Sequence, residues 1–388
     1  MSISLEQHRL LFPGLQNKIY FNYGGQGPLP QSALDAIFQS YQHIQTVGPF
    51  SQKIAVWIAE EFAKTKEAIA TELNVNSETI TLTENVTVGC NIGLWGVNWQ
   101  SNDHILISDC EHPGIIATIN EIQRRFNIQV SVCNLMDTLN EGDPITAITE
   151  KLQDKTKMIV LSHIFWNTGQ LLPLKQISES CKNIIPDVKI LVDAAQSIGM
   201  LPLKLDELGI DFYAFTGHKW WCGAEGLGGL YINPEILADF PPTFIGWRGL
   251  ISHTIDLKND ATKHEVATSN YPILAGLRNA ISLHNQYGSN SARYQQILTL
   301  SKYLWSSLSN LPEIECLRKS PPETGLVSFI VKKHSSKDVV KFLENNQIYL
   351  RMINEPDCIR ACTHYFTTFD EIDQLVSKIK ELLVIKSK

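Results

Sequence analysis

The sequence lacks several features that would each point to a particular class of protein. Its eight cysteines include no CxxC pair, which argues against a disulfide framework and against a metal site. It has no cluster of lysine and arginine, and its net charge is −7, so nucleic acid is not an expected partner. No apolar run approaches the roughly eighteen residues of a membrane span. The first eight residues do not resemble a signal peptide. We therefore expect a cytoplasmic protein without membrane contact.

The composition is that of a soluble globular protein. The chain has 388 residues, of which 44% are hydrophobic and 19% charged, enough for one large domain and a smaller one. Short apolar, β-branched runs alternate with longer helical patterns, which predicts an α/β fold with a mainly parallel sheet and helices on both faces. The predicted strands are 79–83, 104–107, 130–132, 158–161, 190–192, 212–215 and 229–232.

The pattern changes after about residue 260. A long helical region is predicted over 273–308, followed by strands at 326–331 and 348–351 and a closing amphipathic helix from about Glu371. This mixture predicts a second, smaller α+β domain. We expect residues 20–260 to form the large domain, and residues 1–19 and 261–388 to form the small one.

An acid, an amide and a lysine follow two neighbouring predicted strands. Asp193 and Gln196 come after the strand at 190–192, and Lys219 comes after the strand at 212–215. Ligands of parallel sheets bind beyond the carboxyl ends of the strands. Pyridoxal phosphate (PLP) chemistry needs a lysine to form the Schiff base and a carboxylate to keep the pyridine nitrogen protonated. The trio therefore favours a PLP enzyme over a helix-capping acid and a surface lysine.

Other polar segments also lie at strand ends, and each has an ordinary structural alternative. Val86 and Thr87 open a helix whose free N–H groups could hold a phosphate, although a threonine there could simply cap the helix. His112 lies in a loop, where a histidine is usually only surface. Asn167 lies in an Asn-Thr-Gly segment that favours a turn. Arg360 could bind a carboxylate or form a structural ion pair.

Taken in order, these motifs resemble the class V branch of fold-type I PLP enzymes, which includes cysteine desulfurases, selenocysteine lyases and cystine C–S lyases. The resemblance runs from about Tyr20 to the final helix. It implies that Val86, Thr87, Thr216 and His218 lie at the cofactor phosphate. The residue after Thr87 is commonly an acid in the family and is valine here.

The resemblance also implies the roles of the remaining site residues. Histidine 112 would stack on the cofactor ring and relay protons, and Asp193 would pair with the pyridine nitrogen. Gln196 would bond to the phenolate oxygen, and Asn167 would bond near the phenolate oxygen or the substrate. Thr268 would reach the phosphate of a neighbouring subunit, which implies a homodimer with shared active sites.

The substrate α-carboxylate would be held by Arg360, with Asn22 and Gly24 close by. A planar guanidinium makes paired hydrogen bonds to a carboxylate and so fixes the orientation of an amino acid. The segment that precedes Thr268, formed by Gly246, Trp247, Arg248 and Gly249, could line the entrance to the same site or form an exposed loop.

Cysteine desulfurases carry a nucleophilic cysteine on a mobile loop before that arginine. In this sequence only residues 352–357 separate Arg351 from Cys358, and Cys358, Arg360 and Cys362 alternate along one predicted strand. A long cysteine arm is therefore not expected.

The resemblance then favours a cystine (or cysteine) C–S lyase that performs β-elimination, in which Lys219 removes the Cα proton. The products would be pyruvate, ammonia and a persulfide or sulfide for an acceptor protein in iron–sulfur cluster assembly. The alternatives are a desulfurase or selenocysteine lyase that uses Cys358 or another thiol, and a non-catalytic dimeric scaffold.

Overall fold

The computed structural model describes residues 4–252 and 254–384. Its helices are α1 (Leu5–Leu10), α2 (Gln31–Val47), α3 (Gln52–Leu73), α4 (Val86–Trp95), α5 (Pro113–Phe126), α6 (Pro144–Thr149), α7 (Leu174–Ile184), α8 (Pro234–Leu237), α9 (Pro272–Tyr287), α10 (Asn290–Ser309), α11 (Ser336–Asn345) and α12 (Phe369–Val384). Its strands are β1 (Ile19–Tyr20), β2 (Ile80–Thr83), β3 (His104–Ser108), β4 (Gln129–Cys133), β5 (Thr156–Ser162), β6 (Lys189–Asp193), β7 (Phe212–Thr216), β8 (Gly228–Ile232), β9 (Ile314–Cys316), β10 (Leu326–Val331), β11 (Ile348–Tyr349), β12 (Arg351–Asn354) and β13 (Asp357–Cys362).

The larger sheet has seven strands in the order β2-β8-β7-β6-β5-β3-β4. Strands β3 to β7 pair in parallel, and β8 runs antiparallel to both β2 and β7. All seven predicted strands occur in this sheet. In the register of the sheet, Ser162 at the end of β5 faces Asp193 at the end of β6.

Alternate residues of the buried strands pack against helices on opposite faces of the sheet. Ile105 of β3 and Val160 of β5 lie in one core cluster with residues of α4 and α5. Their neighbours Leu106 and Ile159 lie in the other cluster, with residues of α3, α7 and α9. Successive strand residues point to opposite faces, so nearly continuous apolar runs supply both layers. The predicted α/β fold with helices on both faces is confirmed.

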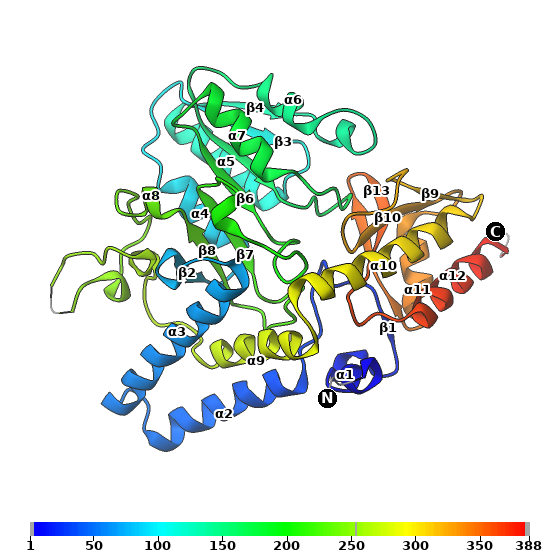
Figure 1. Cartoon of the computed structure of the whole chain (residues 1–388), viewed down its shortest axis with the longest axis horizontal. Helices are drawn as coiled ribbons and strands as arrows, with labels where there is room; N and C mark the ends of the chain where they lie inside the picture. Colours follow the sequence, from blue (N-terminus) through cyan, green and yellow to red (C-terminus); the bar gives the residue numbers. More distant parts are fainter. Residues whose placement is uncertain (1–3, 253, 385–388) are drawn as a thin grey trace.

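The smaller sheet is antiparallel, with the order β12-β13-β10-β9. Residues of α10, α11 and α12 share its core, and Figure 1 shows this unit at the right of the view, beside the larger sheet. The helical region predicted over 273–308 is two helices. The first, α9, ends before Gly288, and the hydroxyl of Ser289 caps α10 by accepting the N–H of Ala292.

The single strand predicted at 348–351 is wrong. Ile348 and Tyr349 pair in parallel with β1, whereas Arg351 begins β12 and pairs with Arg360 of β13. The chain changes its pairing partner at buried Leu350, a change that apolar patterning does not reveal.

The N-terminal segment lies against the C-terminal part of the chain. Arg9 of α1 forms an ion pair with Glu371 of α12 at 2.6 Å. Helix α9 packs on α2 and α3. The division of the chain at residues 19 and 260 stays a prediction. Among the described residues, no helix combines the length and apolar character needed to cross a bilayer.

Candidate active site

Lys219 and Asp193 lie at the carboxyl edge of the parallel strands. Asp193 ends β6 and Thr216 ends β7, and Lys219 follows in the turn after β7. Burial lowers the pKa of Lys219 to about 8, a shift that Arg360 reinforces and Asp193 opposes. Burial raises the pKa of Asp193, while the charge of Lys219 acts in the opposite direction. The two groups are close enough to influence each other, and the lysine is partly a neutral amine near neutral pH.

His112 lies beside the lysine and the acid at the start of α5. Its Nδ1 atom accepts the N–H of Gly114 at 3.2 Å, so its proton is on Nε2. Partial burial lowers its pKa, with Asp193 opposing that shift and Lys219 reinforcing it. Its ring makes an edge contact with Trp166 at 5.8 Å between centroids.

The predicted phosphate residues gather at the start of α4. Asn85, rather than Thr87, caps this helix by accepting the N–H of Val88 at 3.1 Å. Among the described residues, the N–H groups of Val86 and Thr87 have no acceptor. A Cβ added to Gly114 would lie 3.6 Å from Cγ2 of Thr87, which places Thr87 beside the turn of His112. This helix end can accept an anion.

The residues after β7 approach the same helix start. A Cβ on Gly228 would lie 3.0 Å from Cα of Asn85 and 3.1 Å from Cα of Thr216. The Thr216 hydroxyl and Nδ1 of His218 are 2.6 Å apart. Thr216 and His218, which were both predicted to bind the phosphate, thus lie at the carboxyl end of the parallel strands.

Gln196 joins the N-terminal segment to the lysine turn. Its Nε2 donates to the carbonyl of Gly24 at 2.9 Å, and its Oε1 accepts from the indole of Trp220 at 3.0 Å. One hydrogen of Nε2 is left for a ligand.

Arg360 is a buried cation with no carboxylate partner among the described residues. Its Nη1 donates to the carbonyl of Trp166 at 2.6 Å, and its Nε has no hydrogen-bond partner within residues 4–252 and 254–384. A Cβ on Gly24 would lie 2.9 Å from its guanidinium carbon. The structural ion pair considered for Arg360 is therefore absent from the described structure, and a buried guanidinium without an acid suits an anionic ligand.

Two amides complete the group around Arg360. The side-chain oxygens of Asn22 and Asn167 are buried without a donor in the part of the chain that the structure describes, while Nδ2 of Asn167 donates to the carbonyl of Glu355 at 3.1 Å. A buried polar atom without a partner is costly unless a ligand satisfies it. These free acceptors, the Asp193 carboxylate and the lysine fit PLP with an amino-acid substrate.

Thr268 does not join this group in the described chain. It is exposed and lines a hollow with Glu84 and Val88 near the start of α4. Its predicted role across a dimer interface stays a prediction. Arg248 is occupied elsewhere, because it pairs with Glu265 at 2.9 Å and lies 3.5 Å from the ring centroid of Phe62.

Comparison with known proteins places this geometry in a family. The model for aminotransferase class V matches residues 19–375. The chain belongs to the class V aminotransferase family. A solved complex of the cystine C–S lyase C-DES with its reaction product cysteine persulfide has a TM-score of 0.93 and 46% identity, over 95% of this chain and 98% of that chain.

Two further relatives agree with that membership. A C-DES mutant with glycine covalently linked to its PLP cofactor has a TM-score of 0.94 and 45% identity, over 96% of this chain and 98% of that chain. A cysteine desulfurase of Escherichia coli is 26% identical over 98% of this chain and 99% of its own length. The expected family and fold type are thus confirmed.

In this member of the class V aminotransferase family, the strand that carries Arg360 belongs to a tight hairpin. Strands β12 and β13 are joined by Glu355 and Pro356 alone. Cys358 and Cys362 are fully buried on β13, and burial raises the pKa of both thiols. Neither thiol is on a flexible loop.

Sequence reasoning assigned no role to Glu111, which lies directly before His112. Its carboxylate is buried and accepts the N–H of Ser162 at 2.9 Å, the Ser162 hydroxyl at 2.7 Å and the Ser108 hydroxyl at 2.5 Å. Burial raises its pKa to about 7. It joins the His112 turn to the end of β5, next to Asp193. In the sequence, the only sign of this contact is that Glu111 follows Ser108, the last residue of β3, by three positions.

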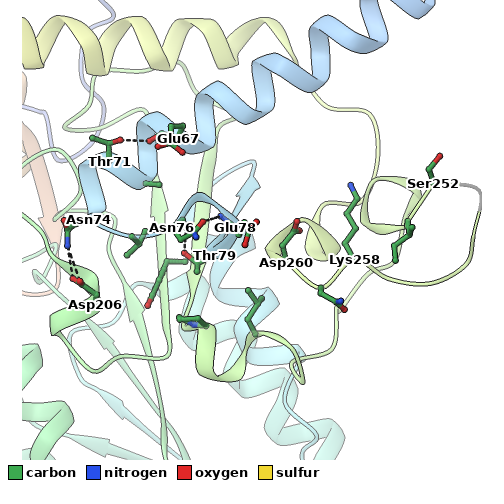
Figure 2. Close-up of a pocket in the computed structure, with 17 residues that line it drawn as sticks. Glu67, Thr71, Asn74, Asn76, Glu78, Thr79, Asp206, Ser252, Lys258 and Asp260 are labelled. Carbon is green, nitrogen blue, oxygen red and sulfur yellow. Dashed lines mark hydrogen bonds between the residues drawn. The ribbon is translucent and has the colours of Figure 1, made fainter.

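A large open hollow lies away from the predicted site residues. It has a volume of about 1160 Å³ and lies between the end of α3 and the loop that contains Lys258 (Figure 2). Asn74 lies 3.2 Å from both carboxylate oxygens of Asp206 there. The described lining includes none of the predicted site residues.

Proposed function

We propose that the chain is a C–S lyase that performs β-elimination on cystine, or on cysteine. The Cβ–S bond breaks, the sulfur leaves as cysteine persulfide (or as sulfide), and water converts the remaining three-carbon unit into pyruvate and ammonia. As a member of its family the chain is a PLP-dependent enzyme. The β12–β13 hairpin favours a lyase over a desulfurase, because it fixes Cys358 inside a strand instead of on a mobile loop.

The lysine and the acid are proposed to work as a pair. Bound PLP withdraws electrons from the substrate Cα and so makes its proton acidic. Lys219 would hold that proton at Nζ, and a pKa of about 8 keeps part of the amine neutral near neutral pH. Asp193, buried at the end of β6, would keep the ring nitrogen protonated through a charge-assisted hydrogen bond.

The substrate is proposed to bind through its carboxylate. Arg360 offers a desolvated guanidinium whose Nε has no partner among the residues described, and the amides of Asn22 and Asn167 are close by. His112 would cover the ring and relay a proton from Nε2, while Val86, Thr87, Thr216 and His218 would hold the phosphate. Gln196 would donate its remaining hydrogen to the phenolate.

No attacking thiol is needed in this proposal. A persulfide is a better leaving group than an alkyl thiolate, because its conjugate acid is stronger, so cystine suits elimination at a site without a mobile cysteine. The solved complex of C-DES with cysteine persulfide supports this choice of substrate.

The test measures products from cystine, cysteine and cysteine sulfinate in parallel assays. We expect pyruvate and persulfide from cystine, and unchanged pyruvate formation by Cys358→Ala and Cys362→Ala. The second candidate is a cysteine desulfurase, favoured by the curated relatives. Formation of alanine, lost when either cysteine is replaced, would establish that candidate instead.

We further propose a homodimer in which Thr268 reaches the partner's phosphate. Large apolar side chains are exposed on the α2–α3 connection and near Thr268, with Phe50 at 102% and Trp247 at 59% of full exposure. Such side chains suit an interface. A monomeric mass in solution would contradict this proposal, and wild-type PLP affinity in Thr268→Ala would contradict the role of Thr268.

The persulfide product also suggests a destination. We propose that a cytoplasmic acceptor protein receives it for iron–sulfur cluster assembly. Cluster formation on an apo-ferredoxin supplied with this enzyme and cystine, compared with free sulfide, tests this step.

A further inference from the structure

The turn that carries Lys219 has all five of its consecutive carbonyls, from residue 217 to residue 221, in hydrogen bonds. Three are held by backbone N–H groups: Gly223 donates to Gly217 at 2.9 Å, Gly27 to His218 at 2.8 Å and Cys222 to Lys219 at 3.0 Å. The last two, of Trp220 and Trp221, have no backbone donor in the described part of the chain. They accept from side chains instead.

Two buried histidines supply those last two donors. Nε2 of His364 lies 3.0 Å from the carbonyl of Trp220, and Nε2 of His284 lies 2.9 Å from the carbonyl of Trp221. A carbonyl can only accept, so both Nε2 atoms carry the hydrogen. The His364 ring also stacks on the Trp220 indole, with 5.8 Å between centroids and a 17° angle between planes.

The hydrogen on Nε2 fixes the direction of a longer chain. A neutral His284 has an acceptor at Nδ1, so the Tyr365 hydroxyl, 2.7 Å away, donates to it. The tyrosine oxygen then accepts from Nε2 of His8, 2.8 Å away. Hydrogen bonds thus run in one direction from α1 to the lysine turn.

The surroundings keep these histidines neutral. Burial lowers the pKa of His8 to about 4 and that of His364 to about 3, and it lowers the pKa of His284 as well. The guanidinium of Arg293 reinforces all three shifts. If Nδ1 of His284 were protonated, it would donate to the tyrosine hydroxyl instead of accepting from it, and the direction of the hydrogen bonds would reverse.

We propose that His284 and His364 are positioning residues for Lys219, and that His8 and Tyr365 hold His284 in the required tautomer. All four lie outside the group of residues proposed to hold the cofactor and the substrate. They fix the backbone from which the lysine side chain extends, and misplacement of a reacting group by about 1 Å costs about a hundredfold in rate. The effect on rate rests on the proposed function, whereas the rigidity of the turn does not.

The experiment compares His284→Asn with His284→Gln in the holoenzyme. A glutamine amide nitrogen can replace Nε2, whereas an asparagine amide reaches only as far as Nδ1. Hydrogen exchange is followed at the amides of Cys222 and Gly223, which close the turn. The matched control is His104→Asn, a fully buried histidine at the start of β3 that bonds to Thr156.

We expect exchange at both amides to rise by about tenfold in His284→Asn, because local opening of the turn becomes easier. The absorbance of the lysine-linked cofactor should broaden, and kcat for cystine should fall by about tenfold with KM within about twofold. His284→Gln should restore all three values towards wild type. The control should leave them unchanged.

Wild-type exchange and absorbance in folded His284→Asn would overturn the proposal, as would equal changes in His104→Asn. If His284→Asn does not fold, two other variants give the same decision: Tyr365→Phe removes the hydrogen bonds of the tyrosine to His284 and His8, and His364→Asn removes the bond to the carbonyl of Trp220. Exchange is measured without substrate. If the wild-type protein does not act on cystine but the expected differences in exchange between the variants are seen, the lyase is refuted and the positioning role stays supported.

Discussion

The guanidinium carbon of Arg360 lies 2.9 Å from the point where a Cβ on Gly24 would be. Only glycine leaves room for the buried arginine at this approach. We expect Gly24→Ala to push the guanidinium away, raising KM for cystine by about tenfold with a smaller effect on kcat. Steady-state kinetics test this, with Gly288→Ala as the control, because its Cβ would make only an ordinary contact. An unchanged KM would remove Arg360 from the substrate site.

The guanidinium geometry of Arg360 should matter beyond its charge. Arg360→Lys keeps the charge but loses the planar fork, and hydrogen bonds to charged groups contribute about 1.5–3 kcal/mol. We expect KM for cystine to rise by at least about tenfold. Isothermal titration with a non-reactive amino acid measures the same loss without turnover. Equal affinity in the two proteins would refute a two-point contact.

Lys219 should lose its proton at an unusually low pH. Burial lowers its pKa to about 8, with help from Arg360 and Arg351, so the neutral amine becomes more abundant as pH rises through about 8. In the PLP-free protein, acylation of Lys219 should follow that curve. Arg351→Gln removes a neighbouring cation and should move the curve to higher pH, while Arg125→Gln should not. A shift to lower pH in Arg351→Gln would contradict the electrostatic cause.

Glu111 should make stability depend on pH. Its pKa rises from 4.5 to about 7 on burial, so its protonated form favours the fold. That contribution is present below about pH 4.5 and is lost as pH rises to about 7, at a cost of up to about 3 kcal/mol. Glu111→Gln should therefore be more stable than wild type at pH 8, and the gain should shrink at pH 5.

Urea unfolding at the two pH values measures this difference. The control is Glu72→Gln, because Glu72 is also buried but lies 3.6 Å from the guanidinium of Arg293. Its loss should destabilise the protein at both values. A gain for Glu111→Gln that did not vary with pH would show that burial of charge is not the cause.

The sequence predicted the larger sheet well because its strands are short apolar runs separated by helices. Asp193 and Lys219 could be found for the same reason, since each follows a strand whose end is easily located. The clearance of Arg360 by Gly24 could not be found, because it depends on how two distant segments approach. The partner change at Leu350 was missed because pairing leaves no mark on apolar patterning.

The hydrogen bonds to the lysine turn show the same limit. His284, His364 and His8 come from distant parts of the chain, and an isolated histidine in a helix or near a strand end has no distinctive spacing. Their tautomers follow only from carbonyl acceptors that the fold brings to them. Pattern therefore locates reactive groups, and packing determines how firmly they are held.

The contacts of α1 impose an order on the making of the protein. His8 is made 357 residues before its partner Tyr365, and Arg9 is made 362 residues before its partner Glu371. Helix α1 must therefore wait for these later residues before it can dock. The sheet that carries Asp193 can assemble earlier, so the lysine turn acquires its outermost support only after Tyr365 has been made.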